Sequence, residues 1–372
     1  MRLARPLALA LLFAGVSLPA LAVEPVVGDP GIKSIEAIAF GPDGLLLIGD
    51  GKGAQVVAIE TGDLKTIQWT KTEIANIKDH LAGRLGTTAS GIDILKMAVN
   101  PASHKVYIAV KKLQAKQEII VVLDGDGKVS EFPLEKVKHT RFALNPGEKS
   151  KVTLVTDLTW TGDRILVAAQ ANETFGSKLF SIRLDSSEAV CFSTETYHVA
   201  HGKWETQAPI RTVIPYFEGG KKYIVGAFTC TPIVRYDLED LKPSAKVKGE
   251  SVIELGYGNH PRDMFTYEKD GKNYILMSTF RKFGQQNDPV RPSAYWTVKI
   301  DQTILGETEK INQKALTRTA GKGKSSESTT DRAVPVPAYD GVMHMDRLDA
   351  ARAVVIRMDA KEAIDLAVLP LP

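Results

Sequence analysis

Residues 37–50 read AIAFGPDGLLLIGD, which is an apolar run, a Gly-Pro-Asp-Gly turn and a second apolar run. Gly, Pro and Asp supply the backbone angles of tight turns, and short apolar runs on both sides of such a turn indicate paired strands. Five further segments repeat this pattern along the chain. Their turns lie at residues 101–104, 161–163, 218–220, 269–271 and 339–341.

Each repeat continues into a third apolar run that ends near an acidic residue, such as VVAIETGD at 56–63 and IIVVLDGDG at 119–127. A four-stranded antiparallel unit that recurs four to eight times closes into a β-propeller, which leaves no long sheet edge exposed. We therefore predict an all-β fold, a six-bladed β-propeller with four-stranded antiparallel blades. Seven blades, or a pair of β-sandwiches, are the alternatives. One helix is expected within residues 72–85, where Ile74, Ile77 and Leu81 have helical spacing.

Two of the repeats carry a family resemblance. AIAFGPDGLLLIGD and DLTWTGDRILVAA (residues 157–169) are similar to the strand, turn, strand signature of secreted β-propellers of the NHL, YVTN and strictosidine-synthase-like kind. The resemblance covers most of the chain and implies a secreted propeller. It implies no particular activity, because the signature is shared by proteins with many functions.

The N-terminal residues predict export. Arg2 and Arg5 precede an apolar run that begins at Pro6, and Ala20 and Ala22 have the spacing of a signal-peptidase site. We expect a signal peptide over residues 1–22 and one propeller domain over 23–372, in the periplasm or secreted. No later segment has the ~20 apolar residues of a membrane span. The net charge of +3 comes from mixed acidic and basic residues, which gives no reason to expect nucleic acid as a partner.

Two cysteines in an oxidising compartment predict a disulfide between Cys191 and Cys230, with two unpaired thiols as the alternative. In a propeller, the loops between the second and third strands of a blade and those between blades lie on one rim. The sequence makes these loops longer than the turns of the opposite rim. We expect function on this long-loop rim, because loops carry binding residues when a rigid scaffold presents them.

The long-loop rim collects cations and aromatic residues, a mixture that suits a small anionic ligand or another exported protein. The candidate ligand-binding residues are Lys203, Trp204, His260, Arg262, Asp263 and Arg281. Metal sites are the second kind of candidate. His198 and His201, together with His260 and His344, could bind a transition metal, because imidazole is a ligand for such ions.

Acidic residues of the innermost strands suggest another metal site. Glu36, Asp157 and Asp263 are expected near the propeller axis, where lactonase-type propellers bind a divalent cation; the asparagines of that family's pattern are missing here. The cofactor stays open, with a divalent metal ion as the candidate. Three functions therefore follow from the sequence: a non-catalytic binder of an anion or a protein, a metal-dependent lactonase-like hydrolase, or an accessory subunit of a periplasmic complex.

Overall fold

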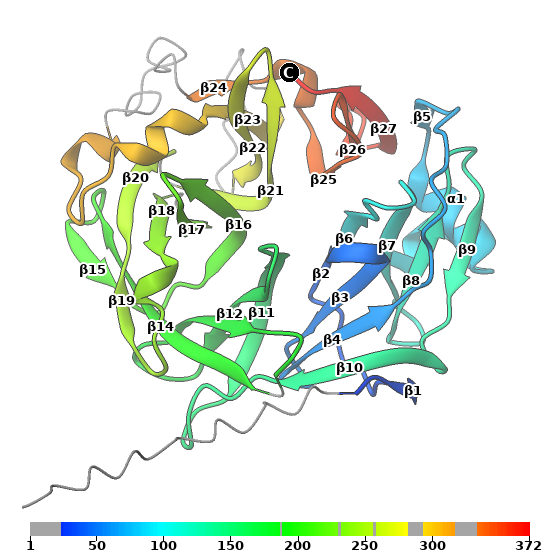
Figure 1. The fold of residues 1–372 in the computed structure, drawn as a ribbon. Helices are drawn as coiled ribbons and strands as arrows, with labels where there is room; N and C mark the ends of the chain where they lie inside the picture. The colour runs from blue at the N-terminus through cyan, green and yellow to red at the C-terminus, as the bar shows by residue number, and fades with distance from the viewer. Residues whose placement is uncertain (1–23, 187, 230–231, 256–257, 282–292, 317–332) are drawn as a thin grey trace, which may run out of the picture.

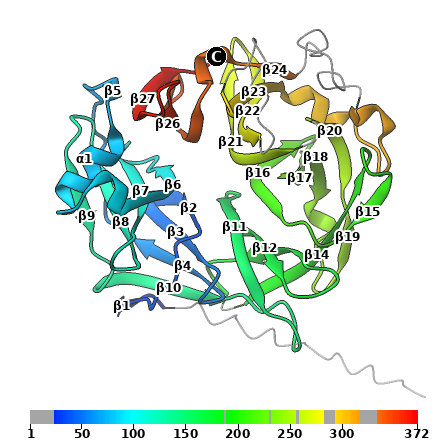
Figure 2. The ribbon, with the colours of Figure 1, turned by 180° about the vertical axis from the view of Figure 1, so that it is seen from behind.

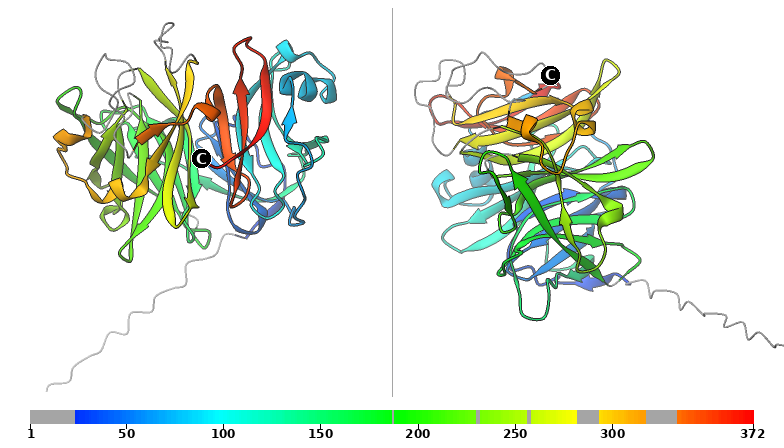
Figure 3. Two further views of the ribbon diagram at one scale, coloured as in Figure 1. Left: turned by 90° about the horizontal axis from the view of Figure 1, so that it is seen from above. Right: turned by 90° about the vertical axis from the view of Figure 1, so that its left-hand side faces the viewer.

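The computed structural model describes residues 24–186, 188–229, 232–255, 258–281, 293–316 and 333–372. These residues form six sheets around a central axis, antiparallel except for one short pairing in blade three, which confirms the six-bladed β-propeller (Figure 1). In side view the sheets stand next to one another as twisted blades (Figure 3). Among the described helices, none is long and apolar enough to cross a membrane.

We number the blades by the order in which their innermost strands occur in the chain. Blade one contains β2 (Ala37–Phe40), β3 (Leu45–Asp50), β4 (Gln55–Glu60), β10 (Val137–Ala143) and β1 (Val26–Gly28). Blade two contains β6 (Ile92–Val99), β7 (Val106–Lys112), β8 (Gln117–Leu123) and β9 (Val129–Phe132). Blade three contains β11 (Val152–Trp160), β12 (Ile165–Ala171), β13 (Ser177–Ile182), β14 (Ala189–His198) and β15 (Lys203–Glu205), with β19 (Lys246–Lys248) parallel to β14.

Blade four contains β16 (Ile210–Glu218), β17 (Lys221–Phe228), β18 (Pro232–Asp237) and β20 (Glu250–Glu254). Blade five contains β21 (Asn259–Lys269), β22 (Lys272–Arg281), β23 (Tyr295–Asp301) and β24 (Ala333–Pro335). Blade six contains β25 (Val342–Arg347), β26 (Arg352–Met358), β27 (Ile364–Pro370) and β5 (Glu73–Ile74). The described α-helix is α1 (Ile77–Arg84), within the segment predicted to be helical. Short 3₁₀ helices are η1 (Pro42–Gly44), η2 (Ala89–Gly91), η3 (Leu238–Asp240), η4 (Gln302–Gly306), η5 (Gln313–Leu316) and η6 (Pro337–Tyr339).

The order of the blades around the axis differs from their order in the chain. The innermost strands contact one another in the sequence β6, β2, β11, β16, β21, β25 and back to β6 (Figure 2). Blade two therefore lies between blades one and six. The chain leaves blade one after three strands, builds blade two, and returns as β10 to supply the fourth strand of blade one. On the way to blade two, β5 pairs with β27 and completes blade six.

The segment that makes this jump, residues 61–72, crosses the short-turn rim of blade two; we call it the crossing segment. Its backbone is fixed by hydrogen bonds from Ile67 N to the Ser103 carbonyl (2.9 Å) and from Thr70 N to the Gly125 carbonyl (2.9 Å). A Cβ atom at position 125 would lie 2.1 Å from the carbonyl oxygen of Gln68, so the close approach of the crossing segment requires glycine here. The crossing segment thus packs on the turns of blade two and is hydrogen-bonded to them.

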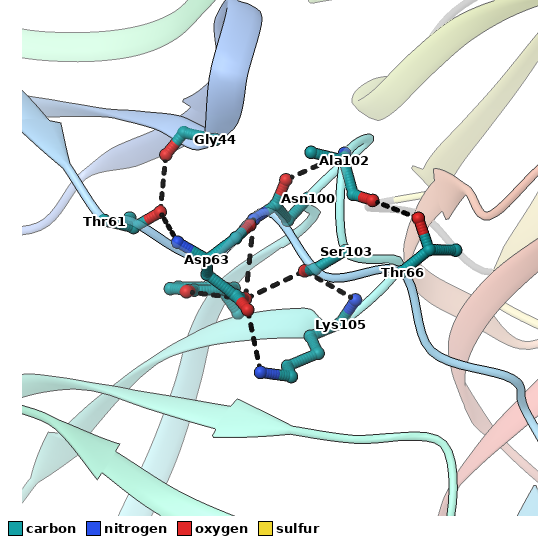
Figure 4. A network of polar contacts seen from close by, with 9 residues as sticks. Gly44, Thr61, Asp63, Thr66, Asn100, Ala102, Ser103 and Lys105 are labelled. Atoms are coloured by element: carbon teal, nitrogen blue, oxygen red, sulfur yellow. Dashed lines mark hydrogen bonds and ion pairs between the residues drawn. The ribbon is translucent and has the colours of Figure 1, made fainter.

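Asp63 anchors the beginning of the crossing segment (Figure 4). Its carboxylate accepts hydrogen bonds from Lys105 Nζ (2.7 Å), Ser103 Oγ (2.8 Å) and the Tyr107 hydroxyl (3.1 Å), and Asn100 Nδ2 bonds to its carbonyl (2.8 Å). Asn100, Ser103 and Tyr107 are almost completely buried. Burial, and then the charge of Asp63, raises the pKa of Tyr107, which keeps its hydroxyl protonated as a donor.

The core consists of six apolar clusters, one at each contact between neighbouring blades. β3 explains how a continuous apolar run serves this architecture. Leu46 and Ile48 point into the cluster with blade two, and Leu47 points into the cluster with blade three. Because side chains alternate between the faces of a strand and both faces are buried, the sequence is apolar at every position rather than at every second one.

The sixth repeat was assigned one strand out of place. Residues 339–341 were predicted as the turn between the first and second strands, but η6 and Gly341 precede β25, which is the innermost strand itself. The first turn of blade six lies instead between Arg347 and Arg352. The prediction failed because β5, from far upstream in the sequence, is the fourth strand of this blade. The last three strands of the chain are therefore its first, second and third strands, and each was assigned one position too late.

The structure gives the predicted Cys191–Cys230 disulfide no support. Cys191 is free and lies in β14, paired with Phe180; Cys230 lies outside the described residues. The pairing of the two cysteines therefore stays a prediction. The predicted signal peptide, residues 1–22, also lies outside the described residues and stays a prediction.

Candidate functional site

One position of the innermost strands is polar in all six blades. It precedes the apolar part of each strand and is occupied by Glu36, Lys96, Asp157, Thr212, Asp263 and His344. We call this set the channel belt. In five of the six inner strands the pairing register shifts beside this position. Such irregularities are typical of places where a strand re-aims a side chain next to a functional site.

The carboxylates near the axis hold neighbouring blades together. Each accepts a hydrogen bond from a backbone N–H of the innermost strand of an adjacent blade, which would otherwise be unsatisfied. The pairs are Glu36 with Val155 (2.8 Å), Asp157 with Val213 (2.8 Å), Asp263 with Met345 (3.1 Å) and Asp346 with Val99 (2.8 Å).

Of the three acidic residues predicted to meet at the axis, two lie together. Asp157 and Asp263 line a cavity of about 300 Å³ that the second halves of the inner strands enclose. Glu36 is not among the lining residues, and its carboxylate is held by Val155 N and Ser34 Oγ (3.0 Å). Glu36 therefore holds the contact between blades one and three and does not join Asp157 and Asp263 in the cavity, as the lactonase-like arrangement would require.

The two aspartates of the cavity differ in the direction in which their surroundings shift the pKa. Burial alone would raise the pKa of Asp263, but Lys96 (3.5 Å), His344 and Arg262 outweigh it and lower the pKa to about 2. Burial raises the pKa of Asp157, and the opposing effect of Lys96 does not cancel it. Asp263 is therefore the ion-paired carboxylate of the belt.

Two arginines lie at the end of the channel where the inner strands begin. Arg211 is the second residue of β16 and Arg262 the fourth residue of β21, each at a shift of register. The Nε atom of Arg211 is buried and has no hydrogen-bond partner among the described residues. Burial, and then repulsion from Arg262, lowers the pKa of the Arg211 guanidinium. The two guanidinium groups thus lie close enough to repel each other. Asp157 attracts Arg211 and Asp263 attracts Arg262, but no described carboxylate forms an ion pair within 4 Å of either arginine.

The remaining residues predicted to bind a ligand lie in different places. Arg281 is buried, with its guanidinium 5.1 Å from the centre of the Trp296 ring, and His260 pairs with Phe280 in the same sheet. Lys203 and Trp204 lie in β15, at the outer edge of the propeller and away from the axis (Figure 1). Trp204 packs against Tyr197, with 5.5 Å between ring centres. The predicted set is therefore divided between the channel and an outer hairpin.

The outer hairpin, β14 and β15, brings His198 and His201 together as predicted, with 3.9 Å between ring centres. His260 and His344 lie on the inner strands of other blades and do not join them. The structure adds Glu205 and Glu254, which the sequence analysis missed. The sequence analysis also missed Lys96 and Arg211 at the channel. An alignment of the six repeats at the belt position would have shown Lys96.

A larger hollow of about 660 Å³ lies between blades one and two. Lys33, Lys52 and Lys116 line it, but so do four acidic residues, Asp29, Glu118, Glu131 and Glu135. The acidic residues outnumber the lysines by one, and so the hollow has no preference for an anion comparable to that of the two arginines.

No protein-family model matches the sequence, and no curated protein sequence matches it. Among solved structures, the chain is similar to two structures of the plexin A4 extracellular region, with TM-scores of 0.39 and 0.38, and to the C-terminal WD40 domain of Sif2, with a TM-score of 0.30. Sequence identity is 8% in all three, and the alignments cover 94%, 94% and 95% of this chain. The chain spans 40% and 51% of the two plexin chains and 99% of the WD40 domain. The propeller assignment rests on the sheet order described above and not on these similarities.

Proposed function

We propose that this propeller is a non-catalytic binding protein, and that Arg211 and Arg262 at the long-loop end of the channel bind a small oxyanion, a carboxylate or a phosphate. The observation that carries the proposal is the buried Nε of Arg211, which has no partner among the described residues and lies beside a second guanidinium. A buried donor without an acceptor costs about 1–3 kcal/mol. An oxyanion would supply the acceptor and neutralise the repulsion.

The charges around the arginines favour an anion over a cation. Lys96, Arg211 and Arg262 face two carboxylates, Asp157 and Asp263. Asp263 is already paired with Lys96, and burial raises the pKa of Asp157, which disfavours its charged form. Arginine presents a planar fork of donors that matches the two oxygens of a carboxylate or phosphate. We also propose that the protein is exported. Its anionic group would then belong either to a small molecule or to another exported protein.

Titration with inorganic phosphate and with succinate tests the proposal and distinguishes the two oxyanion classes. We expect one of them to bind, and Arg262→Gln to weaken binding roughly tenfold to 100-fold, because a hydrogen bond to a charged group contributes about 1.5–3 kcal/mol. Arg347→Gln is the matched control, since this exposed arginine lies at the opposite end of an inner strand. Equal losses in both variants, or no binding of either anion, would refute the proposal.

The same site predicts a separation of binding from stability. Because Arg211 is destabilised by burial and by Arg262, Arg211→Met should leave the free energy of unfolding unchanged or increase it, while it abolishes anion binding. Chemical denaturation of the anion-free variant and the wild type measures this. A marked loss of stability in Arg211→Met would mean that the arginine serves the fold instead of a ligand.

A further inference from the structure

We propose that His198, His201 and Glu205, on the outer hairpin of blade three, form a binding site for a transition-metal ion of the Zn²⁺ kind. This site is separate from the channel and does not depend on the anion proposal. Potential ligand atoms of the three side chains all lie within 4.8 Å of one another, which the described residues show for no other set of three such side chains.

The hairpin geometry produces this arrangement. His198 pairs with Lys203 across the two strands, and the turn between them places His201 above His198. Glu205, the last residue of β15, turns its carboxylate between the two rings. Its Oε1 lies 2.8 Å from His201 Nδ1 and 3.8 Å from His198 Nδ1.

The spacing of the ligand atoms is close to that of a tetrahedral metal site. The shorter separation is a hydrogen bond between His201 Nδ1 and Glu205 Oε1 (2.8 Å), which a bound ion would replace. Metal–ligand bonds of about 2.0–2.1 Å at a tetrahedral ion separate neighbouring ligand atoms by roughly 3.3 Å, and the two observed separations lie on either side of that value. Three protein ligands leave the fourth position of a tetrahedral ion open to water or to an external ligand. His201 and Glu205 are partly exposed, so an ion can reach the site from solvent.

Glu254 supplies the second carboxylate that such sites use. It is completely buried in β20 of blade four and accepts hydrogen bonds from Val199 N (2.6 Å) and Ala200 N (3.1 Å), which fixes the hairpin turn. Its Oε2 lies 3.6 Å from His198 Nε2, an atom that is buried and has no hydrogen-bond partner among the described residues. A metal-binding histidine usually directs its second nitrogen to a carboxylate in this way. The geometry therefore assigns Nδ1 of His198 to the metal and Nε2 to Glu254.

His198 is the buried member of the site, with a side chain that is 3% exposed. Lys203 opposes an ion, with its Nζ 3.6 Å from Glu205 Oε1, but this side chain is 66% exposed and free to turn into water.

Calorimetric titration of the purified, untagged protein with Zn²⁺ tests the site. We expect saturable binding of one ion per chain, with a rise in melting temperature. Loss of a group that merely orients a ligand costs about 10–100-fold in affinity, so His201→Ala and Glu205→Gln, which remove ligands, should each weaken binding at least about 100-fold. Both positions are partly exposed, and these variants should fold normally.

Two control variants separate the site from general imidazole or charge effects. His80→Gln removes an exposed imidazole from α1, and should bind Zn²⁺ like the wild type. Lys203→Ala removes a cation beside Glu205 without removing a ligand, and should bind equally or more tightly. The proposal is wrong if Zn²⁺ does not bind at one ion per chain, or if His201→Ala and Glu205→Gln bind it as well as His80→Gln does.

Discussion

Asp63→Ala is expected to destabilise the protein by at least about 3 kcal/mol, because the substitution removes one acceptor that satisfies several buried donors. Ser103 and Tyr107 are almost completely buried and cannot turn to water, and the carboxylate itself is 13% exposed. Lys105 would lose its ion pair in the same step. Equilibrium unfolding in urea, followed by circular dichroism, measures the loss.

The matched control for Asp63 is Asp185, whose ion pair with Arg183 is also short (2.7 Å) but fully on the surface. Exposed ion pairs contribute about 0–1 kcal/mol, so Asp185→Ala should have little effect. If both variants lose similar stability, the crossing segment is not held by the Asp63 network. Hydrogen exchange would add the location: in Asp63→Ala, the amides of Ile67 and Thr70 should lose protection before those of the blade interiors.

Asp263→Ala is the second substitution with a large expected effect, a loss of about 3–5 kcal/mol. The carboxylate is 15% exposed, pairs with Lys96 of blade two, and accepts from Met345 N of blade six. Its removal leaves a partly buried ammonium group and a backbone donor unpaired at the point where three blades meet. Asp263→Asn keeps an acceptor for Met345 and removes only the charge, and so it should cost less, about 2 kcal/mol.

The pH dependence of this second effect has a definite sign. The pKa of Asp263 is lowered from 3.8 to about 2 in the folded protein, so the folded state favours the charged form. The corresponding stabilisation is fully present above about pH 5 and is lost as the pH falls from about 4 to about 2. The difference in unfolding free energy between the wild type and Asp263→Asn should therefore shrink over that interval. A difference that stays constant down to about pH 3 would contradict the ion-pair explanation.

The strands and the number of blades could be predicted from the sequence because their signals are local. Runs such as LLLIGD and KVYIAV, bounded by turn residues, indicate strands wherever they lie in the ring. The ring order could not be predicted. β5 is a strand of two residues, and β10 follows β9 with no local feature to show that it pairs with β4 instead of opening a new blade. The contacts between the inner strands, and the pairing of β10 with β4 and of β5 with β27, reveal that blade two was inserted beside blade one.

The candidate sites were predicted in part for a similar reason. His198 and His201 are close in sequence, so their meeting in space could be expected from residue spacing alone. Glu254 comes from another blade, and its contact with the hairpin depends on how blades three and four pack. Arg262 was expected on the functional rim, but Arg211 was missed because one arginine at a strand start gives no signal until the strand is placed beside β21. Lys203 and Arg281 were grouped with Arg262 because the loop order predicts on which rim of the propeller a residue lies. It does not predict how far from the axis the residue lies.

A crystal structure of the protein with the tighter-binding of phosphate and succinate tests the central claim most directly. We predict that the anion lies between Arg211 and Arg262, with an oxygen within hydrogen-bond distance of Arg211 Nε. An anion bound instead among Lys33, Lys52 and Lys116 in the hollow between blades one and two, or an Arg211 that pairs with a protein carboxylate while the anion is bound elsewhere, would contradict the account.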